Sequence, residues 1–315
     1  MYAVAAPAQS DSLLVVFWNV ENFFDFKDDG VSDSERSFSA AGDRHWTKKR
    51  FYAKCNAISK TLMMIADSNG RLPDAVGFAE VENSFVLRQF VSSTLLRKPG
   101  YRFIHFDSPD RRGIDCALLY NPAVLELEHA TPRHLYDSSG AVIPTRDILL
   151  TRFRTRSDTS LAILVNHHPS KLGGGASDRR SIAMDTMLSL MDSLHSSGCH
   201  RLLAIGDFND TLWPDSPTAG PGVPSSFPAS ETHNSSTGSK SDVSPQGTIK
   251  FNGAWEKIDG HFARGMEVEE KVWDSPLLCT PDKQFGGVKP LRTYSGPRWL
   301  GGISDHFPVV LWVHY

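Results

Sequence analysis

Short apolar runs alternate with longer amphipathic stretches along this chain. Nine runs have the length and composition of strands, and many are apolar at consecutive positions, which is typical of strands covered on both faces. The predicted strands span residues 12–20, 74–81, 101–106, 115–121, 149–155, 161–167, 201–208, 257–263 and 307–315. The pattern therefore predicts a fold built around largely buried strands.

Three stretches between these runs have hydrophobic residues at helical spacing. They span residues 47–67, 84–96 and 177–198. Thr47 has the character of an N-cap for the first stretch, while Ser177 and Gly198 mark the two ends of the third. Because strands and helices interleave, the sequence predicts an α/β fold in which sheets are sandwiched between helices.

Residues 211–250 differ from the rest of the chain because they are rich in Ser, Pro, Gly and Thr. This composition predicts a long loop or a partly disordered insertion. The segment is either a surface excursion or, since it follows the motif GDFND (206–210), a flap on the substrate side. We expect residues 1–11 to form a flexible N-terminus and residues 12–315 to form a single domain that contains the insertion.

Several predicted strands begin or end with polar residues, and this repetition is the main indication of function. A single carboxylate at a strand end is usually a turn or cap residue, but several such ends in one chain indicate a shared site. In open α/β sheets, ligands bind beyond strand ends because side chains from separate strands converge there. The polar residues are Asn19, Glu21, Glu80, Glu82, His167, His168, Asp207, Asn209, Asp305 and His306.

These side chains match the needs of metal-dependent phosphoester hydrolysis. Carboxylate and amide oxygens hold hard divalent cations. A carboxylate or an imidazole can orient and deprotonate a water molecule, and hydrogen-bond donors can meet the charge that develops on phosphoryl oxygens. A zinc peptidase is a poor fit because the sequence has no HExxH motif and its four cysteines form no CxxC pair.

Composition and charge narrow the choice of partner and compartment. A net charge of −3 gives no strongly basic footprint overall, although it is compatible with a local basic groove. No apolar run approaches the roughly 18 residues of a transmembrane helix. The first residues, MYAVAAPAQS, have the small-x-small spacing found near signal cleavage sites, which favours export over a cytoplasmic location; a frayed start is the alternative. The cysteines leave the disulfide status open.

An ordered set of motifs resembles the endonuclease/exonuclease/phosphatase superfamily, with its deoxyribonuclease I-like and exonuclease III-like members of bacterial type. The motifs are WNVEN (18–22), AEVEN (79–83), RGIDCALLY (112–120), NHHPSK (166–171), GDFND (206–210), KIDGHF (257–262) and SDHFP (304–308). Each is moderately specific, and the ordered set is highly specific. The resemblance implies a four-layer α/β sandwich in which two mixed β-sheets pack face to face with helices outside.

The resemblance also implies a binding site for Mg²⁺ or Mn²⁺. Glu80 matches the principal metal ligand of the family. Glu21 stands where many members have an acidic residue that supports the metal, and Asp305 resembles a further ligand. Asn19 matches the amide that lies beside both the metal and the phosphate.

The same resemblance implies catalytic roles for five further residues. Asp207 matches the carboxylate that orients or activates the attacking water, and Asn209 matches the amide that holds the scissile phosphate. His306 matches the histidine that faces this phosphate. Asp259 resembles the carboxylate that orients that histidine, and His167 aligns with a phosphate-contacting position.

Some neighbouring polar residues have simpler interpretations. Asn83 is better explained as the N-cap of the following helix than as a ligand, and the same interpretation disfavours Glu82. His168 is expected to point to the other face of its strand, and Asp210 to cap a turn. Asp115 is expected to pair with Arg112 or with a histidine, in a structural or a supporting role.

The substrate is not determined by these residues. We rank a phosphodiesterase or nuclease first and a phosphomonoesterase or lipid or inositol-phosphate esterase second. A nuclease would need basic side chains along a groove, and a lipid enzyme would need an exposed apolar hairpin. A catalytically inactive binding module is the third interpretation, and it would lack the catalytic side chains. We expect a monomer that acts on a phosphodiester, with nucleic acid among the candidate substrates.

Overall fold

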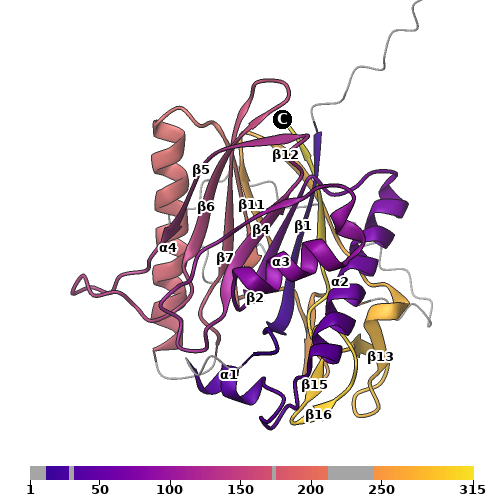
Figure 1. Ribbon diagram of the computed structural model, residues 1–315. Helices are drawn as coiled ribbons and strands as arrows, with labels where there is room; N and C mark the ends of the chain where they lie inside the picture. Colours follow the sequence, from indigo (N-terminus) through magenta and orange to yellow (C-terminus); the bar gives the residue numbers. More distant parts are fainter. Residues whose placement is uncertain (1–11, 28–31, 172–174, 212–244) are drawn as a thin grey trace, which may run out of the picture.

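Two large mixed β-sheets pack face to face in the computed structural model (Figure 1). The structure describes residues 12–27, 32–171, 175–211 and 245–315. The predicted N-terminal segment, 1–11, and residues 212–244 of the predicted insertion lie outside the described residues, so the expectations for both stay predictions.

The first sheet has six strands and the second has five. The order in the first is β12 (Glu267–Val272), β17 (Val309–His314), β1 (Ser12–Phe23), β2 (Ala75–Val81), β4 (Asp115–Tyr120) and β3 (Arg102–His105). The order in the second is β11 (Asp259–Arg264), β8 (Arg201–Asp207), β7 (Ser160–His167), β6 (Ile148–Thr155) and β5 (Leu125–Arg133). The pairs β1–β2 and β7–β8 are parallel and the other pairs are antiparallel, so both sheets are mixed.

Side chains alternate along β1 and so serve two hydrophobic cores. Val15 and Phe17 lie in the core between the sheets, together with Ile205 of β8. Val16 and Trp18 lie in the core on the opposite face of the first sheet. This alternation explains why the strand is apolar at consecutive positions, as the sequence predicted.

Helices cover the outer faces of both sheets, which completes the predicted four-layer sandwich (Figure 1). The helical elements are α1 (Asp33–Ser37), α2 (Lys48–Asn69), α3 (Ser84–Ser93), α4 (Ala176–Ser196) and the 3₁₀ turns η1 (Leu95–Arg97) and η2 (Pro276–Leu278). The α2 and α3 helices pack on the six-stranded sheet, and α4 packs on the five-stranded sheet.

The helix ends agree with the predicted caps in two cases and differ in one. The Thr47 side chain accepts a hydrogen bond from the Arg50 amide at the start of α2, as predicted. The Asn83 side chain caps α3 by accepting from the Val86 amide. The prediction that Ser177 caps α4 is wrong, because the N-cap is Gly175, which has a left-handed φ of 67° and no side chain to donate or accept.

All nine predicted strands are present, and two long strands were missed. These are β5 and β12, which lie at edges of their sheets and are exposed at many positions. An edge strand with one solvated face carries charged residues, so its sequence lacks the apolar run that identifies a buried strand.

Three short hairpins lie along the chain between β8 and β17. They are β9 (Ile249–Phe251) with β10 (Ala254–Glu256), β13 (Cys279–Pro281) with β14 (Val288–Pro290), and β15 (Tyr294–Ser295) with β16 (Arg298–Trp299). Ile249 forms an isolated antiparallel bridge with His306, so the first hairpin lies directly against a predicted catalytic residue.

Candidate active site

The polar ends of the central strands meet at one end of the two sheets. The pairs β1–β2 and β7–β8 are parallel, so their carboxyl-terminal residues emerge at the same edge. A hydrogen bond from Asn19 Nδ2 to Asp207 Oδ2 (3.0 Å) joins the two sheets there. Asp259 begins β11 opposite Asp207. The Ser304 hydroxyl donates to the Asn19 carbonyl oxygen (2.6 Å), which fixes the segment that precedes β17.

Asp207, Asp259 and His306 form a buried cluster of two acids and an imidazole. His306 Nδ1 lies 2.8 Å from Asp259 Oδ2, and His306 Nε2 lies 3.9 Å from Asp207 Oδ2. Burial alone would lower the pKa of His306, but the charges of Asp259 and Asp207 outweigh it and raise that pKa well above its ordinary value. Burial, together with the Asp259 charge, raises the pKa of Asp207 to about 7.

Asn209 and His167 complete the part of the site that lies on the five-stranded sheet. The Asn209 amide donates to Asp207 Oδ1 (3.0 Å), and its side-chain nitrogen donates to the His168 carbonyl oxygen (2.9 Å). His167 Nε2 lies 3.7 Å from Asp207 Oδ2. Burial and the Arg146 charge lower the pKa of His167 well below its ordinary value, so the imidazole is neutral.

Glu80 comes from the end of β2 and faces the same end of the sandwich. Its Oε2 accepts a hydrogen bond from the Asn22 amide (2.7 Å). Arg112 Nη1 approaches Oε1 only to 3.5 Å, and Arg112 Nη2 donates to Asn22 Oδ1 at 2.7 Å. Glu80 is therefore held at one oxygen and loosely approached at the other.

Glu21 is more fully engaged than Glu80. Its Oε1 accepts from Arg292 Nη2 (3.0 Å), and its Oε2 accepts from the Thr293 amide (2.7 Å). Arg292 also pairs with Asp305 Oδ2 (2.8 Å). Burial and the nearby Asp305 charge raise the pKa of Glu21 to about 7. Glu21 and Asp305 thus share one arginine, because both accept from Arg292 Nη2.

Lys54 supports the site from α2 and was missed by the sequence prediction. The side chain is almost fully buried. Its Nζ donates to the Glu21 carbonyl oxygen and to Thr293 Oγ1 (2.8 Å), and burial lowers its pKa to about 8. The sequence did contain an indication of this role, because Lys54 interrupts the apolar helix face that includes Phe51 and Ile58.

Four non-glycine residues of the site have a left-handed backbone. The φ angles are 46° at Glu21, 51° at Asn22, 66° at Glu80 and 52° at Asn209. Such conformations cost about 1–3 kcal/mol each, and they persist where surrounding contacts enforce them, often at functional sites. Hydrogen bonds to the Glu80 and Asp207 carboxylates provide that enforcement for Asn22 and Asn209.

The donor set at this end fits a hard divalent cation. Within the described residues, Glu80 Oε1 has only 3.5 Å contacts to Arg112, and Asp305 and Glu21 lie close enough to share Arg292. Asp207, Asp259 and His306, whose ligand atoms lie within 4.8 Å of one another, form the adjacent part of the site, where Asp259 and His306 already bond to each other. Carboxylate oxygens dominate the site, which also includes Glu80, and this chemistry suits Mg²⁺ or Mn²⁺.

The neighbouring residues behave largely as the sequence indicated. Glu82 accepts a hydrogen bond from the Asp25 amide (2.6 Å), away from the cluster. The His168 ring packs edge-on against Phe208 in the core. Asp210 accepts from the Thr211 amide (2.8 Å), as a turn cap does.

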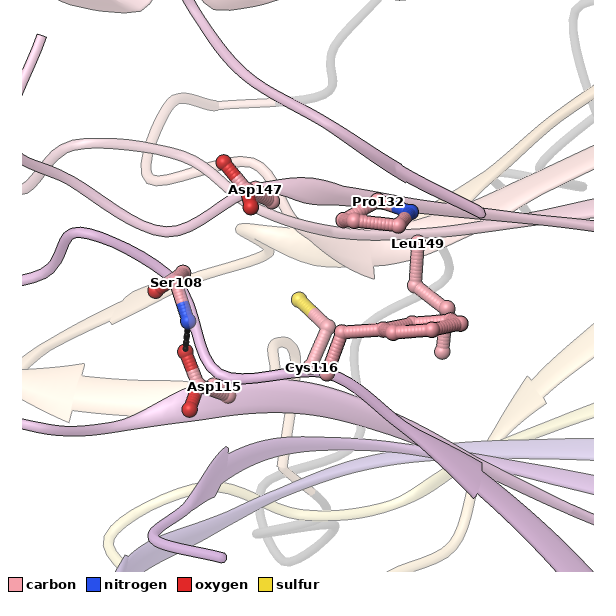
Figure 2. A pocket seen from close by; sticks show the side chains of 7 residues that line it. Ser108, Asp115, Cys116, Pro132, Asp147 and Leu149 are labelled. Atoms are coloured by element: carbon pink, nitrogen blue, oxygen red, sulfur yellow. Dashed lines mark hydrogen bonds between the residues drawn. The ribbon is translucent and has the colours of Figure 1, made fainter. Parts of the chain in front are cut away.

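Asp115 pairs with a histidine rather than with Arg112. Its Oδ2 lies 3.4 Å from His105 Nε2, and its Oδ1 accepts from the Ser108 amide (3.0 Å). A pocket of about 10 Å³ lies beside it, between the two sheets (Figure 2). Figure 2 shows that Asp115, Cys116 and Asp147 all line this pocket. This pocket has room for about one water molecule, so it is not a substrate site.

The sequence matches the model of the Endonuclease/Exonuclease/phosphatase family over residues 14–315. The chain therefore belongs to this family, as its motifs predicted. A comparison with curated proteins gave no match. No helix in the described part of the chain is long and apolar enough to cross a membrane.

Solved structures with the same fold have low sequence identity. An endonuclease/exonuclease/phosphatase family protein from Bacteroides thetaiotaomicron has a TM-score of 0.56 at 18% identity, with 98% of this chain and 99% of that chain covered. A mannosyl-6-phosphatase from the same organism has a TM-score of 0.54 at 16% identity, with 96% and 100% covered. The human nocturnin catalytic domain, with a bound sulfate anion, has a TM-score of 0.53 at 15% identity, with 97% and 95% covered. These similarities establish the fold.

Members of this family are divalent-metal-dependent phosphoesterases. The chain carries the acidic and imidazole groups that this chemistry needs, gathered at one end of the sandwich. The fold and the site together define a hydrolase of phosphoester bonds.

Proposed function

We propose that the protein is a phosphodiesterase of the nuclease type, which uses Mg²⁺ or Mn²⁺ to hydrolyse its substrate by in-line attack of water. The observation that carries the proposal is the buried arrangement in which Asp259 holds His306 at 2.8 Å while Asp207 lies on the other side of the ring. An acid behind an imidazole fixes its tautomer and favours the imidazolium, as in hydrolase triads.

Asp207, Asn209 and His306 have separate roles in the proposed reaction. Asp207 orients the attacking water and accepts its proton as the new P–O bond forms. The P–O bond to the leaving group breaks on the opposite side of phosphorus, and the leaving oxygen takes a proton from solvent. Asp207 is itself held by Asn19 Nδ2 and the Asn209 amide. The second N–H of the Asn209 side chain, which His168 leaves free, donates to a phosphoryl oxygen. His306 Nε2 donates to the same phosphoryl group. The negative charge that develops on the phosphoryl oxygens in the transition state is thus stabilised by donors that the fold has already positioned.

Glu80 is the principal residue that would hold the cation, with Asp305, Glu21 and Asn19 around it. A bound divalent cation supplies polarisation of the phosphoryl oxygen and charge neutralisation. Glu80 is suited to this role because, within the described residues, its Oε1 makes only two contacts, both of 3.5 Å and both to Arg112. Glu21 contributes chiefly by fixing Arg292 and Thr293, since both of its oxygens already accept hydrogen bonds.

Hydrolysis of two chromogenic substrates tests the proposal. Bis-p-nitrophenyl phosphate is a diester and p-nitrophenyl phosphate is a monoester. We expect the wild-type protein to cleave the diester with Mg²⁺ or Mn²⁺ and to lose this activity in EDTA. Cleavage of the monoester alone would replace the proposal with a phosphomonoesterase.

A further inference from the structure

A line of arginines runs along the edge of the active site on the side of the six-stranded sheet. We call Arg44, Arg50, Arg111 and Arg298 the arginine rim. Arg111 and Arg298 are exposed, and the other two are partly exposed. Figure 1 shows α1 and the β15–β16 hairpin, which flank the rim, near the end of β1.

Hydrogen bonds to backbone groups connect the chain segments that carry the rim arginines. The Arg112 carbonyl oxygen accepts from Ser32 Oγ (3.3 Å), which caps α1. At the other end of α1, the Arg44 amide donates to the Ser37 carbonyl oxygen (3.1 Å). The Tyr294 hydroxyl then donates to the Arg44 carbonyl oxygen (2.8 Å), which reaches the β15–β16 hairpin.

The segments that carry the rim contain neighbouring residues that touch the site. Arg112, which follows Arg111, approaches Glu80. Thr293, which precedes Tyr294, donates its amide to Glu21. The chain segments that carry the rim are therefore anchored beside two predicted metal-site residues, Glu80 and Glu21.

Aromatic rings hold two rim arginines in place. The Arg44 guanidinium carbon lies 5.2 Å from the Phe38 ring centroid and 5.3 Å from that of Tyr294. The Arg50 guanidinium carbon lies 5.1 Å from the Trp299 ring centroid. Such stacking restricts an arginine without neutralising its charge.

The rim charges have no carboxylate partner within 4 Å in the described part of the chain. Arg50 Nη1 donates instead to the carbonyl oxygens of Arg44 (2.7 Å) and His45 (2.8 Å). Carbonyl oxygens are neutral, so they satisfy the donors and leave the positive charge in place. Four uncompensated arginines therefore lie along one edge of a protein whose net charge is −3.

Basic residues on the opposite side of the site are paired. Arg146 lies 3.2 Å from Asp110, and Arg180 lies 3.8 Å from Asp210. Lys171 pairs with Glu256. These three basic residues are paired with carboxylates whereas the rim arginines are not, and this difference favours a chain of phosphates that passes over the rim.

We propose that the arginine rim binds the phosphates of a nucleic acid strand whose scissile phosphate lies in the active site. This deepens the proposed phosphodiesterase function and rests on it. Recognition is through phosphates rather than bases, because the rim's aromatic rings are already covered by arginines and by one another. A phosphomonoester of a small molecule would not extend to the rim.

Binding of a fluorescein-labelled 12-nucleotide oligothymidylate, measured by anisotropy in EDTA, tests the proposal. EDTA separates binding from hydrolysis, so the result is independent of whether the proposed activity is found. The variant replaces Arg44, Arg111 and Arg298 with Gln. Single-strand binding falls with salt by a slope of about −0.7 per neutralised phosphate, so losing three contacts should weaken binding about 100-fold at 0.1 M salt and reduce the slope by about 2.

A matched control replaces Arg97, Lys98 and Arg102 with Gln. These residues are also exposed, and they lie near the start of β3, at the opposite end of the first sheet from Glu80. The charge change is the same, and the control should bind like wild type. Thermal melting of both variants confirms that they fold.

Three outcomes would overturn the proposal. The first is a wild-type salt slope near zero, which needs no variant. The second is equal weakening by the rim variant and the control. The third is unchanged oligonucleotide binding by the rim variant together with loss of binding to phosphatidylserine vesicles, which would assign the rim to a membrane surface.

Discussion

Asp259 is fully buried, and within the described residues its carboxylate hydrogen-bonds to His306 alone. One of its oxygens accepts from the imidazole, and the other has no partner among the described residues. Burying a carboxylate in this way is costly unless it stabilises a neighbouring positive charge. At the scale of single residues, the site is therefore organised around charge rather than around packing.

The substitution Asp259→Asn tests this organisation. The amide keeps the shape of the side chain but removes the charge that raises the pKa of His306. We expect kcat for diester hydrolysis to fall on the order of 100–1000-fold, with a small change in KM, because the lost interaction acts in the transition state. Near-wild-type turnover would show that His306 does not depend on Asp259.

Residues that act through tertiary contacts could not be found from the sequence. Arg112 lies in the motif RGIDCALLY, but its approach to Glu80 spans 32 positions. Arg292 and Glu21 are 271 positions apart. By contrast, Asp207 and Asn209 were predictable because a buried strand ending in acid and amide is a local pattern.

Strands and helices place the site residues, and side-chain hydrogen bonds determine where some of these elements begin. Asn83 shows how a residue beside the site can serve the fold alone. It is the last residue of the motif AEVEN, just after β2 ends at Val81, yet its side chain accepts from the Val86 amide and so begins α3. The buried strands were predictable from their apolar runs. The edge strands β5 and β12 were not, because their solvent-exposed positions carry charged residues that interrupt such a run.

The substitution Asn83→Ala separates the cap from the chemistry. Loss of an N-cap costs about 1 kcal/mol of stability. We expect the free energy of unfolding, measured with urea, to fall by that amount while diester turnover stays near wild type. A loss of turnover comparable to that of Asp259→Asn would instead show that Asn83 takes part in catalysis.

At the scale of the whole molecule, an ionic contact joins the edges of the two sheets. Glu270 of β12 is approached by His261 of β11, with Nδ1 2.6 Å from Oε2, and by Lys257. Burial would raise the pKa of Glu270, but the hydrogen bond from His261 and the charge of Lys257 outweigh it, so that pKa is lowered.

From the Glu270 contact we predict how the stability of the protein depends on pH. A carboxylate whose pKa is lower in the folded protein stabilises the fold above its unfolded pKa of 4.5, and the stabilisation disappears as pH falls through the folded value. We expect Glu270→Gln to be less stable than wild type at pH 7 by roughly 3 kcal/mol. The difference should shrink below about pH 4. A difference that is constant with pH would contradict the assignment.

The most direct test of the account compares the substitutions Asp207→Asn and Asp210→Asn. Both remove one carboxylate from the motif GDFND, but Asp207 lies in the buried cluster while Asp210 caps a turn. Rates of bis-p-nitrophenyl phosphate hydrolysis would be measured at saturating Mn²⁺. We predict a loss on the order of 100–1000-fold for Asp207→Asn and less than a few-fold change for Asp210→Asn. Equal rates for wild type and Asp207→Asn would contradict the proposed mechanism.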